Sequence, residues 1–518
     1  MADVIGGLGS GFAAFGDPTY ILLALVGVVL GTVVGVLPGI GPIGAMSVLL
    51  GMTPQLGPTG SLILFAGIYF GSTYGGSTTS ILLNVPGEAS SVVTALDGHE
   101  MTKRGRGGPA LAIAAVSSFV AGTVAIFGLM VFAPWLSGVA VKLGPPEYMA
   151  LCLAGLLLLA ALSNGSTAKA VVMICAGLAV GTVGIDPAGG DLRFTLGSDV
   201  LAEGFSFIAL VMGVFGVAEV LAATGRRWRP ETVKAPKLRE LLPSRQESRE
   251  AAPAAVRGSL LGFLLGLVPG PAAVLSTFAS YVTERKLSKH PGRFGKGAVE
   301  GVAGPEAANN AAAGAAFVPL LALGIPFAPT MALVLAALLL NGIVPGPTLI
   351  DDQPELFWTV IAAMYIANLA LLVLNLPLVG LFTRLLSVPP QALMPIVIGL
   401  CVVGVYAENN SMFDVLVMLI AGLLGFVLRR AGFGMAPFVL AVVLQPTLET
   451  SLRQTLAYSD GNPGYVLGRP VTMVILGLVI LAVALSARRA LRARKTATPS
   501  PIAHEERPVS SGAEGPRG

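Results

Sequence analysis

The feature of this chain that most limits its fold is a series of apolar runs, each long enough to cross a bilayer as a helix of roughly 20 residues. The runs begin near Tyr20, Ser61, Ala110, Tyr148, Lys169, Phe205, Leu260, Met331, Trp358, Pro395, Val415 and Thr472. Only 12% of the 518 residues are charged, and aromatic residues are sparse while Gly and Pro are abundant, which favours helices over a β-barrel. The sequence therefore predicts an all-α, polytopic membrane protein with about 10–14 transmembrane or re-entrant helices.

Basic residues concentrate in two polar segments. One lies between Gly225 and Arg257, and the other, Ala487 to Lys495, follows the last apolar run. Both are expected in the cytoplasm because Lys and Arg mark the cytoplasmic loops of membrane proteins. They divide the chain into a first membrane repeat (residues 1–224), a basic cytoplasmic linker (225–257), a second membrane repeat (258–490) and a disordered cytoplasmic tail (491–518). The N-terminus shows no cleavable signal pattern.

Each half opens with a helix break of the same kind. The first half contains GVLPGIGPIGAM from Gly35 and the second GLVPGPAAVLST from Gly266. A second break follows in each half at a similar offset, ILLNVPGEASS from Ile81 and PLLALGIPFAP from Pro319. We interpret this pattern as an internal duplication, with the two repeats more plausibly inverted than parallel.

The charge pattern around the break at Pro269 and Gly270 constrains the path of the chain. Basic segments precede Leu260 and follow at Glu284 to Lys296, so one full crossing between them would place one basic loop outside. A chain that turns back part-way through the membrane removes this conflict. The sequence predicts a re-entrant helical hairpin from Leu260 to Tyr281.

Broken helices inside a membrane expose backbone groups that must be buried in protein or face a water-filled cavity. Secondary transporters place such breaks at substrate and ion sites, whereas any single Pro-Gly is more often a packing feature. Two pairs at matching offsets favour a binding site. Around these breaks we select Pro38, Gly39, Gly41, Asn84, Pro86, Gly270 and Pro326 as candidate substrate- or ion-binding residues.

Polar residues between the breaks supply further candidates. The first half offers hydroxyls and glycines without charge, in Ser72, Thr73, Gly75, Gly76, Ser77 and Thr78, which suits carboxylate oxygens or a partly dehydrated cation. The second half offers Glu306, Asn309 and Asn310, whose spacing of three and four allows one shared helix face. This cluster can cap a half-helix that begins after Pro305, join helices by amide hydrogen bonds, or bind ligand or a coupling ion. We expect Glu306 to start the half-helix and the two Asn side chains to face the cavity.

Several enzyme signatures are missing. There is no phosphate-binding loop, no paired catalytic carboxylates, no Ser-His pair and no metal-ligand cluster at membrane depth. Asp97, Glu100, Glu408 and Asp414 fall in loop-like or span-edge contexts, where solvated side chains are expected. The sequence therefore predicts no enzyme, no catalytic residues and no metal site.

The motifs resemble those of the large membrane subunit of the tripartite tricarboxylate transporters, the TctA family. The resemblance rests on LPGIGPIGA, YGGSTTSILLNVPGEASSVVTALDGHEM, FGKGAVEGVAGPEAANNA, NGIVPGPTL and LETSLRQTLAYSDGNPGYVLGRP. It departs from the family pattern at Ala272, where the family has P-G-x-G, and at Phe327, where the family has G-I-P-G. The second half therefore differs from the family at both breaks.

The resemblance implies a multi-pass secondary transporter of the bacterial inner membrane that imports tricarboxylates or related carboxylates. It also implies a small four-helix membrane subunit, an extracytoplasmic solute-binding protein and a coupling cation, Na⁺ or H⁺, with no other cofactor. The alternatives are a passive carboxylate channel without ion coupling and, with least support from the residues, an intramembrane enzyme.

Overall fold

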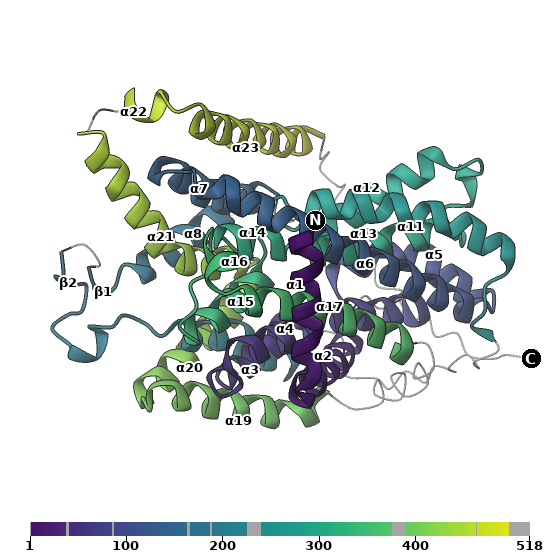
Figure 1. Ribbon diagram of the computed structural model, residues 1–518, viewed down its shortest axis with the longest axis horizontal. Coiled ribbons are helices and arrows are strands. Elements are labelled where there is room, and N and C mark those ends of the chain that lie inside the picture. Colours follow the sequence, from purple (N-terminus) through teal and green to yellow (C-terminus); the bar gives the residue numbers. More distant parts are fainter. Residues whose placement is uncertain are drawn as a thin grey trace, which may run out of the picture.

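The structure is a computed structural model that describes residues 2–37, 41–84, 87–162, 166–186, 189–224, 240–375, 390–460, 462 and 464–496. Figure 1 shows a helical bundle with one small two-stranded sheet among the described residues. The first half comprises α1 (Ala2–Ala13), η1 (Ala14–Gly16), α2 (Pro18–Val36), α3 (Gly41–Leu50), α4 (Thr53–Leu83), η2 (Ala89–Ser91), α5 (Val92–Lys103), α6 (Gly107–Ala140), α7 (Pro145–Leu162), α8 (Thr167–Gly181), β1 (Gly184–Ile185), β2 (Leu192–Arg193), η3 (Asp199–Leu201), α9 (Phe207–Val211), η4 (Met212–Val217) and α10 (Ala218–Thr224).

The second half begins with α11 (Arg245–Gly266), α12 (Ala272–Leu287), η6 (Pro291–Arg293), α13 (Glu300–Ala315), α14 (Phe317–Leu323), α15 (Pro329–Leu340) and α16 (Leu349–Asp352). It continues with α17 (Pro354–Asn375), α19 (Pro390–Asn409), α20 (Met412–Arg430), α21 (Ala436–Tyr458), α22 (Gly464–Leu467) and α23 (Pro470–Thr496). In the described residues α2, α6, α17 and α20 are long and apolar enough to cross a membrane, and shorter apolar helices accompany them. The prediction of an all-α polytopic membrane protein is confirmed.

Two segment boundaries differ from the sequence-based expectation. Helix α11 begins at Arg245, so residues 245–257 are helical, because Ser244 and Glu247 form a capping box that starts the helix there. Helix α23 continues to Thr496, so residues 491–496 are helical as well. The rest of the basic segment, residues 225–239, and the tail, residues 497–518, lie outside the described residues.

The same glycine packing joins a helix pair in each half. In α2, Gly27, Gly31 and Gly35 lie against the carbonyl oxygens of Leu64, Ile68 and Ser72 in α4. In α11, Gly258, Gly262 and Gly266 lie against those of Gly304, Ala308 and Ala312 in α13. A Cβ added at any of the six would come within 3.0 Å of the facing carbonyl oxygen, so only glycine permits these distances. The two halves therefore share one packing pattern with a four-residue period, while an inverted relation between them stays a prediction.

The predicted hairpin is present. Helix α11 ends at Gly266, the chain turns over Leu267–Pro271, and α12 returns alongside α11 (Figure 1). Arg257 Nε donates to Glu284 Oε1 at 2.9 Å, so both ends of the hairpin lie at the same end of the molecule. The hairpin is confirmed, and its depth in a membrane stays a prediction.

The Arg257–Glu284 pair leads to a stability prediction. Glu284 is 1% exposed and Arg257 is 41% exposed, so Arg257→Gln leaves a buried carboxylate without its cation while solvent screens part of the loss. We expect thermal unfolding in detergent to show a loss of about 1–2 kcal/mol, partly recovered when Glu284→Gln is added. Lys103→Gln, at an exposed pair, is the control and is expected to change little. Equal melting of Arg257→Gln and wild type would show that the pair does not hold the hairpin.

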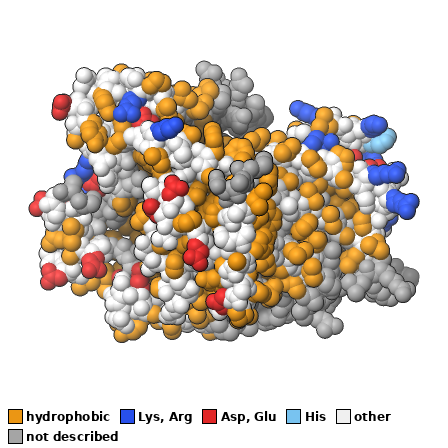
Figure 2. Space-filling view, in the orientation of Figure 1, with side chains coloured by type: hydrophobic (Ala, Val, Ile, Leu, Met, Phe, Trp, Pro, Cys, Tyr) orange, Lys and Arg blue, Asp and Glu red, His pale blue; other side chains and the backbone are white. Residues whose placement is uncertain are grey.

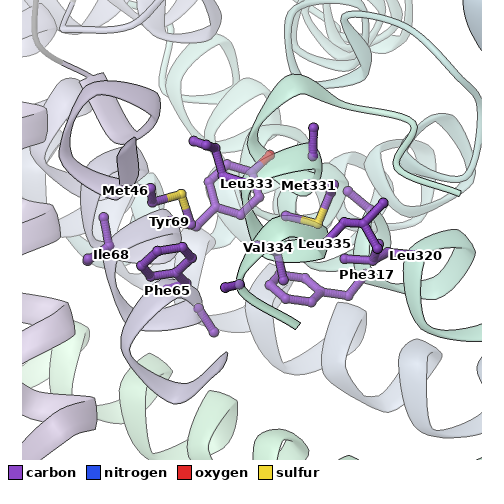
Figure 3. Packing of buried hydrophobic residues seen from close by; sticks show 14 of the residues in the cluster. Met46, Phe65, Ile68, Tyr69, Phe317, Leu320, Met331, Leu333, Val334 and Leu335 are labelled. Carbon is purple, nitrogen blue, oxygen red and sulfur yellow. The ribbon is translucent and has the colours of Figure 1, made fainter. Parts of the chain in front are cut away.

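The central core lies where the two halves meet. Figure 3 shows Met46, Phe65 and Tyr69 of the first half near Phe317 and Met331 of the second, within one buried cluster. The Tyr69 and Phe317 ring centroids are 6.4 Å apart. Because α4 packs against both α13 and α15, this core fixes the broken segments of one half relative to those of the other.

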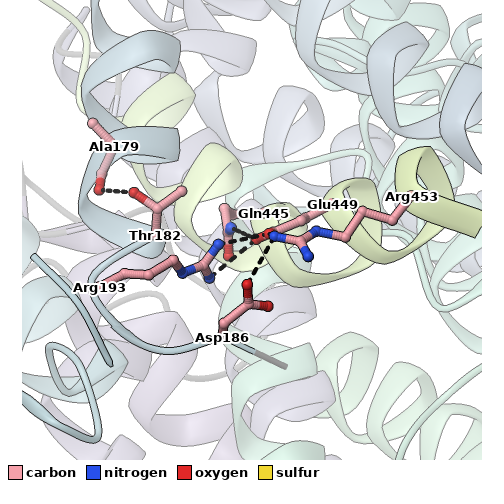
Figure 4. A network of polar contacts seen from close by, with 7 residues as sticks. All are labelled: Ala179, Thr182, Asp186, Arg193, Gln445, Glu449 and Arg453. Carbon is pink, nitrogen blue, oxygen red and sulfur yellow. Dashed lines mark hydrogen bonds and ion pairs between the residues drawn. The ribbon is translucent and has the colours of Figure 1, made fainter. Parts of the chain in front are cut away.

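The two ends of the molecule differ in charge. In Figure 2, Lys and Arg side chains gather at the end where Figure 1 places α5, α11 and α12, whereas Asp and Glu predominate towards the end with β1 and β2. The small sheet is held to α21 by a polar network (Figure 4), in which Arg193 Nη1 donates to Glu449 Oε1 at 2.6 Å and Arg453 Nη2 to Asp186 Oδ2 at 3.0 Å. These ion pairs hold the β1–β2 hairpin against α21 at the acidic end.

Candidate functional site

A cavity of about 440 Å³ lies at the junction of the two halves. The first half contributes Gly41–Gly44, Tyr69, Gly87–Ser90, Phe215 and Glu219, and the second contributes Gly266, Val268, Gly270–Val274, Ala312, Ala316, Phe327–Thr330 and Arg429. Its size lies within the range of small-molecule sites, roughly 300–1,000 Å³. Both breaks of each half therefore border one cavity.

Three helices begin at the wall of this cavity. The first residues of α3 (Gly41), α12 (Ala272) and α15 (Pro329) all line it. The first-turn N–H groups of a helix have no partner within the helix, and its N-terminus carries a partial positive charge. Three such N-termini around one cavity favour an anionic ligand.

The breaks themselves depend on backbone conformations that favour glycine. Gly270 has a φ of 133° between α11 and α12, and Gly324 has a φ of 72° where α14 ends. The Gly270 N–H donates to the Phe327 carbonyl oxygen at 3.2 Å, which ties the two breaks of the second half together. Ala272 and Phe327, which depart from the family pattern, follow Gly270 and Gly324 in the chain, and these two glycines take the positive φ of the breaks.

Three charged side chains line the cavity. Arg429 of α20 donates to Glu219 of α10 at 2.5 Å and lies over the Phe215 ring, with 5.9 Å to the ring centroid. Glu88 forms a capping box with Ser91 at the start of η2. The paired Arg429 gives the wall a cation for a carboxylate, and Glu88 gives it an acceptor for a cation.

Asn309 is buried, and neither its amide oxygen nor its amide nitrogen has a hydrogen-bond partner. It lies one helical turn from Ala312, which lines the cavity, on the same face of α13. The matching glycine contacts make Ala308 equivalent to Ile68, so Asn309 is equivalent to Tyr69, which also lines the cavity. A buried amide without a partner costs about 1–3 kcal/mol, a cost that a ligand can remove.

Glu306 and Asn310 belong to a separate polar cluster between the halves. Glu306 contacts the hydroxyls of Ser77, Thr94 and Ser118, and Asn310 Nδ2 donates to Ser118 Oγ at 2.7 Å. A small cavity of about 20 Å³ beside it is lined by Ser77, Thr78 and Glu306 among others. Hydroxyls dominate this second site, and it has no helix N-terminus.

The sequence of these elements matches a known protein family. The model of the tripartite tricarboxylate transporter TctA family matches residues 21–440. The chain belongs to this family. An uncharacterized 52.8 kDa protein in the TAR-I ttuC' 3' region of Agrobacterium vitis is 46% identical over 96% of this chain and 98% of its own length. An uncharacterized protein in the TAR-II ttuC' 3' region of the same organism is 47% identical over 45% of this chain and 97% of its own length. No solved structure matches the chain.

In this TctA-family protein the candidate residues fall into different places. Gly41 and Gly270 line the large cavity, Pro326 is buried beside the lining residue Phe327, and Asn84 is the exposed C-cap of α4. Thr73 Oγ1 contacts Asn310 Oδ1 at 2.9 Å in the polar cluster. Pro38, Gly39 and Pro86 lie outside the described residues.

The remaining candidates of the first half pack within α4. Ser72 Oγ donates to the Tyr69 carbonyl oxygen at 2.9 Å, and Gly75 lies against the Thr32 carbonyl oxygen of α2. Gly76 lies under the Gly87–Glu88 segment, whose residues line the large cavity. Gly75 and Gly76 thus permit close packing, and a role of any of these residues in binding stays a prediction.

Two sequence-based expectations are wrong. Helix α13 begins at Glu300, so both Pro305 and Glu306 lie inside the helix, and Glu306 does not start it. Asp97 is buried and accepts from the N–H groups of Gly297 and Ala298, each at 2.7 Å, because the chain before α13 folds against α5. Asp97 therefore holds the start of α13 and is not solvated.

Sequence reasoning missed Tyr69, Glu88, Glu219 and Arg429 at the cavity. Glu219 and Arg429 lie at the ends of apolar runs, where charged residues normally mark the membrane surface. Glu88 stands in the break motif VPGEASS, two residues after the selected Pro86, and this charged residue within a break was the signal that could have identified it.

Proposed function

We propose that this protein is the large membrane permease subunit of a secondary transporter that imports tricarboxylates or related carboxylates across the bacterial inner membrane. The observation that carries the proposal is the cavity where the N-termini of α3, α12 and α15 meet. Helix N-termini favour carboxylates, and a site between two related halves suits alternating access. Membership of the family supports the substrate class.

The partners of this transporter are a small four-helix membrane subunit and an extracytoplasmic solute-binding protein. The charge distribution supports the orientation, because the basic end with α5, α11 and α12 is expected in the cytoplasm. The acidic end, with the small sheet held to α21, then faces the binding protein. The substrate would enter the cavity from that end.

A cation gradient, of Na⁺ or H⁺, supplies the driving force in this proposal. The substrate carboxylates lie at the helix N-termini and Arg429, and the amide of Asn309, one helical turn from the lining residue Ala312, supplies a further hydrogen bond. Carbonyl groups freed by the breaks near Gly39 and Gly270, together with Glu88, are the acceptors for a cation. No other cofactor takes part.

The test is uptake of labelled citrate and smaller dicarboxylates into vesicles that contain this chain, the small membrane subunit and a purified binding protein. We expect accumulation above the external concentration that needs both the binding protein and an inward cation gradient. Vesicles without this chain are the control. Equilibration that ignores every gradient would contradict coupling and identify a passive facilitator.

A further inference from the structure

The polar cluster around Glu306 contains a buried carboxyl group without a cation. Glu306 is 1% exposed, and its carboxyl oxygens contact Ser77 Oγ at 2.6 Å, Thr94 Oγ1 at 2.5 Å and Ser118 Oγ at 3.5 Å. None of the ion pairs among the described residues includes Glu306. A carboxylate buried within a membrane segment is costly, so the neutral acid is favoured.

The hydrogen-bond geometry also favours a proton on this group. Ser77 Oγ lies 2.6 Å from Glu306 Oε2 and 2.9 Å from the Thr73 carbonyl oxygen. A serine hydroxyl has one proton, so it cannot donate to both acceptors. If Glu306 is protonated at Oε2, it donates to Ser77, and Ser77 donates to the Thr73 carbonyl. Both short contacts are then hydrogen bonds.

The other members of the cluster are compatible with the protonated acid. Thr94 Oγ1 donates to Glu306 Oε1 at 2.5 Å, so this second carboxyl oxygen also has a hydrogen-bond partner. Ser118 Oγ accepts from Asn310 Nδ2 at 2.7 Å, and the same amide nitrogen donates to the Glu306 carbonyl oxygen at 3.1 Å. Ionisation leaves Ser77 with one donor for two acceptors and leaves the charge with hydroxyl groups alone.

Water has a place beside the carboxyl group. The small cavity of about 20 Å³ is lined by Glu306, Ser77, Ser118, Tyr74, Thr78 and Asn375, and one water needs roughly 10–15 Å³. A water there can pass a proton to or from Oε2 without moving a helix. The cavity therefore has room for a water molecule that exchanges a proton with Glu306.

Other titratable groups around α13 are already bound or lie apart from Glu306. Tyr74 of α4 borders the small cavity, and Asp97 of α5 binds the N–H groups before α13 and the Tyr281 hydroxyl. Arg257 of α11 pairs with Glu284 of α12, and Glu88 lies at the large cavity before η2. Helices α6 and α14 contain no titratable side chain.

We propose that Glu306 is a proton-binding site and that its proton is the coupling ion of the transporter. This inference rests on the proposed function and identifies its cation. Glu306 belongs to the second half, whereas Ser77, Thr94 and Ser118 belong to the first, so loss of the proton weakens contacts between the halves. Helix α13 also carries Asn309 beside the substrate cavity, and a shift of this helix changes both sites together.

The test has two independent arms. In the first, infrared spectra of the purified full chain are recorded from acidic to alkaline pH for wild type, Glu306→Gln and the control Glu300→Gln, on the same helix. We expect a protonated-carboxyl band that is lost in Glu306→Gln and kept in Glu300→Gln. Ser77→Ala is expected to shift this band, which provides a readout if Glu306→Gln does not fold. The proposal is overturned if neither Glu306→Gln nor Ser77→Ala alters the band.

In the second arm, vesicles with both partner proteins are given either a pH gradient or a sodium gradient. Wild-type protein is expected to accumulate substrate on the pH gradient alone, and Glu306→Gln is expected to lose this accumulation. Accumulation by wild type that needs sodium and ignores the pH gradient contradicts the coupling role. If no carboxylate is taken up by wild type, the proposed function fails, while the infrared arm still decides whether Glu306 binds a proton.

Discussion

Asn309→Ala is expected to lower carboxylate uptake by roughly 10- to 100-fold without destabilising the protein, because a hydrogen bond to a charged group contributes about 1.5–3 kcal/mol. The amide of Asn309 is buried and has no partner among the described residues, so its removal breaks no hydrogen bond in that part of the chain. Uptake into vesicles measures the first effect, and thermal unfolding in detergent measures the second. The expected result is a protein that melts at or above the wild-type temperature and transports poorly.

Asn310→Ala is the matched control, one residue further along α13. Its side chain bonds Ser118 Oγ at 2.7 Å and Thr73 Oγ1 at 2.9 Å, so its loss removes two buried hydrogen bonds. This variant is expected to lose about 1–3 kcal/mol of stability. Normal uptake by Asn309→Ala would remove Asn309 from the substrate site, and equal stability losses in both variants would contradict the distinction between them.

Gly31→Ala and Gly262→Ala are each expected to destabilise the fold by about 3 kcal/mol or more, because the new methyl group meets backbone that cannot move aside. The added Cβ would lie within 3.0 Å of the Ile68 carbonyl oxygen in the first case and of the Ala308 carbonyl oxygen in the second. Ala normally stabilises a helix over Gly by roughly 0.5–1 kcal/mol, so a loss reverses the usual sign. Thermal unfolding and the yield of monodisperse protein check this result.

The control is Gly138→Ala in α6, where a Cβ meets no atom within 4 Å. It is expected to be neutral or stabilising. Similar losses at Gly31 and Gly262 would support the equivalence of the two halves. A neutral Gly262→Ala would show that α11 and α13 separate more easily than α2 and α4, and would weaken the assignment of Asn309 by its equivalence to Tyr69.

Local signals in the sequence were sufficient for several elements. The Pro269-Gly270 break between two basic segments predicted the hairpin from Leu260 to Tyr281, because a turn needs local backbone freedom and the side of a loop follows its charge. The apolar runs predicted the membrane helices because the length of a run is also a local property of the sequence. The predicted start of α13 was wrong, because Pro305 was interpreted as a first-turn residue whereas the helix already begins at Glu300.

The candidate site was predicted only in outline. The polar run from Ser72 to Thr78 and the cluster at Glu306 were both selected, yet spacing did not show that Thr73 and Ser77 contact Asn310 and Glu306 at a site separate from the large cavity. Asn309 and Asn310 are neighbours that face different partners, because successive residues of a helix point about 100° apart. Pattern alone could not say which of them meets hydroxyls and which meets the cavity.

The sequence by itself determined that the chain is an all-helical membrane protein with paired breaks, because run length, Pro-Gly turns and charge placement act over short stretches. Only the tertiary structure decided what the polar groups do. Ser77 and Glu306 are 229 positions apart, and Glu219 and Arg429 are 210 apart. Contacts at such separations depend on how whole helices pack, through glycine contacts such as those of Gly31 and Gly262, and no local pattern encodes them.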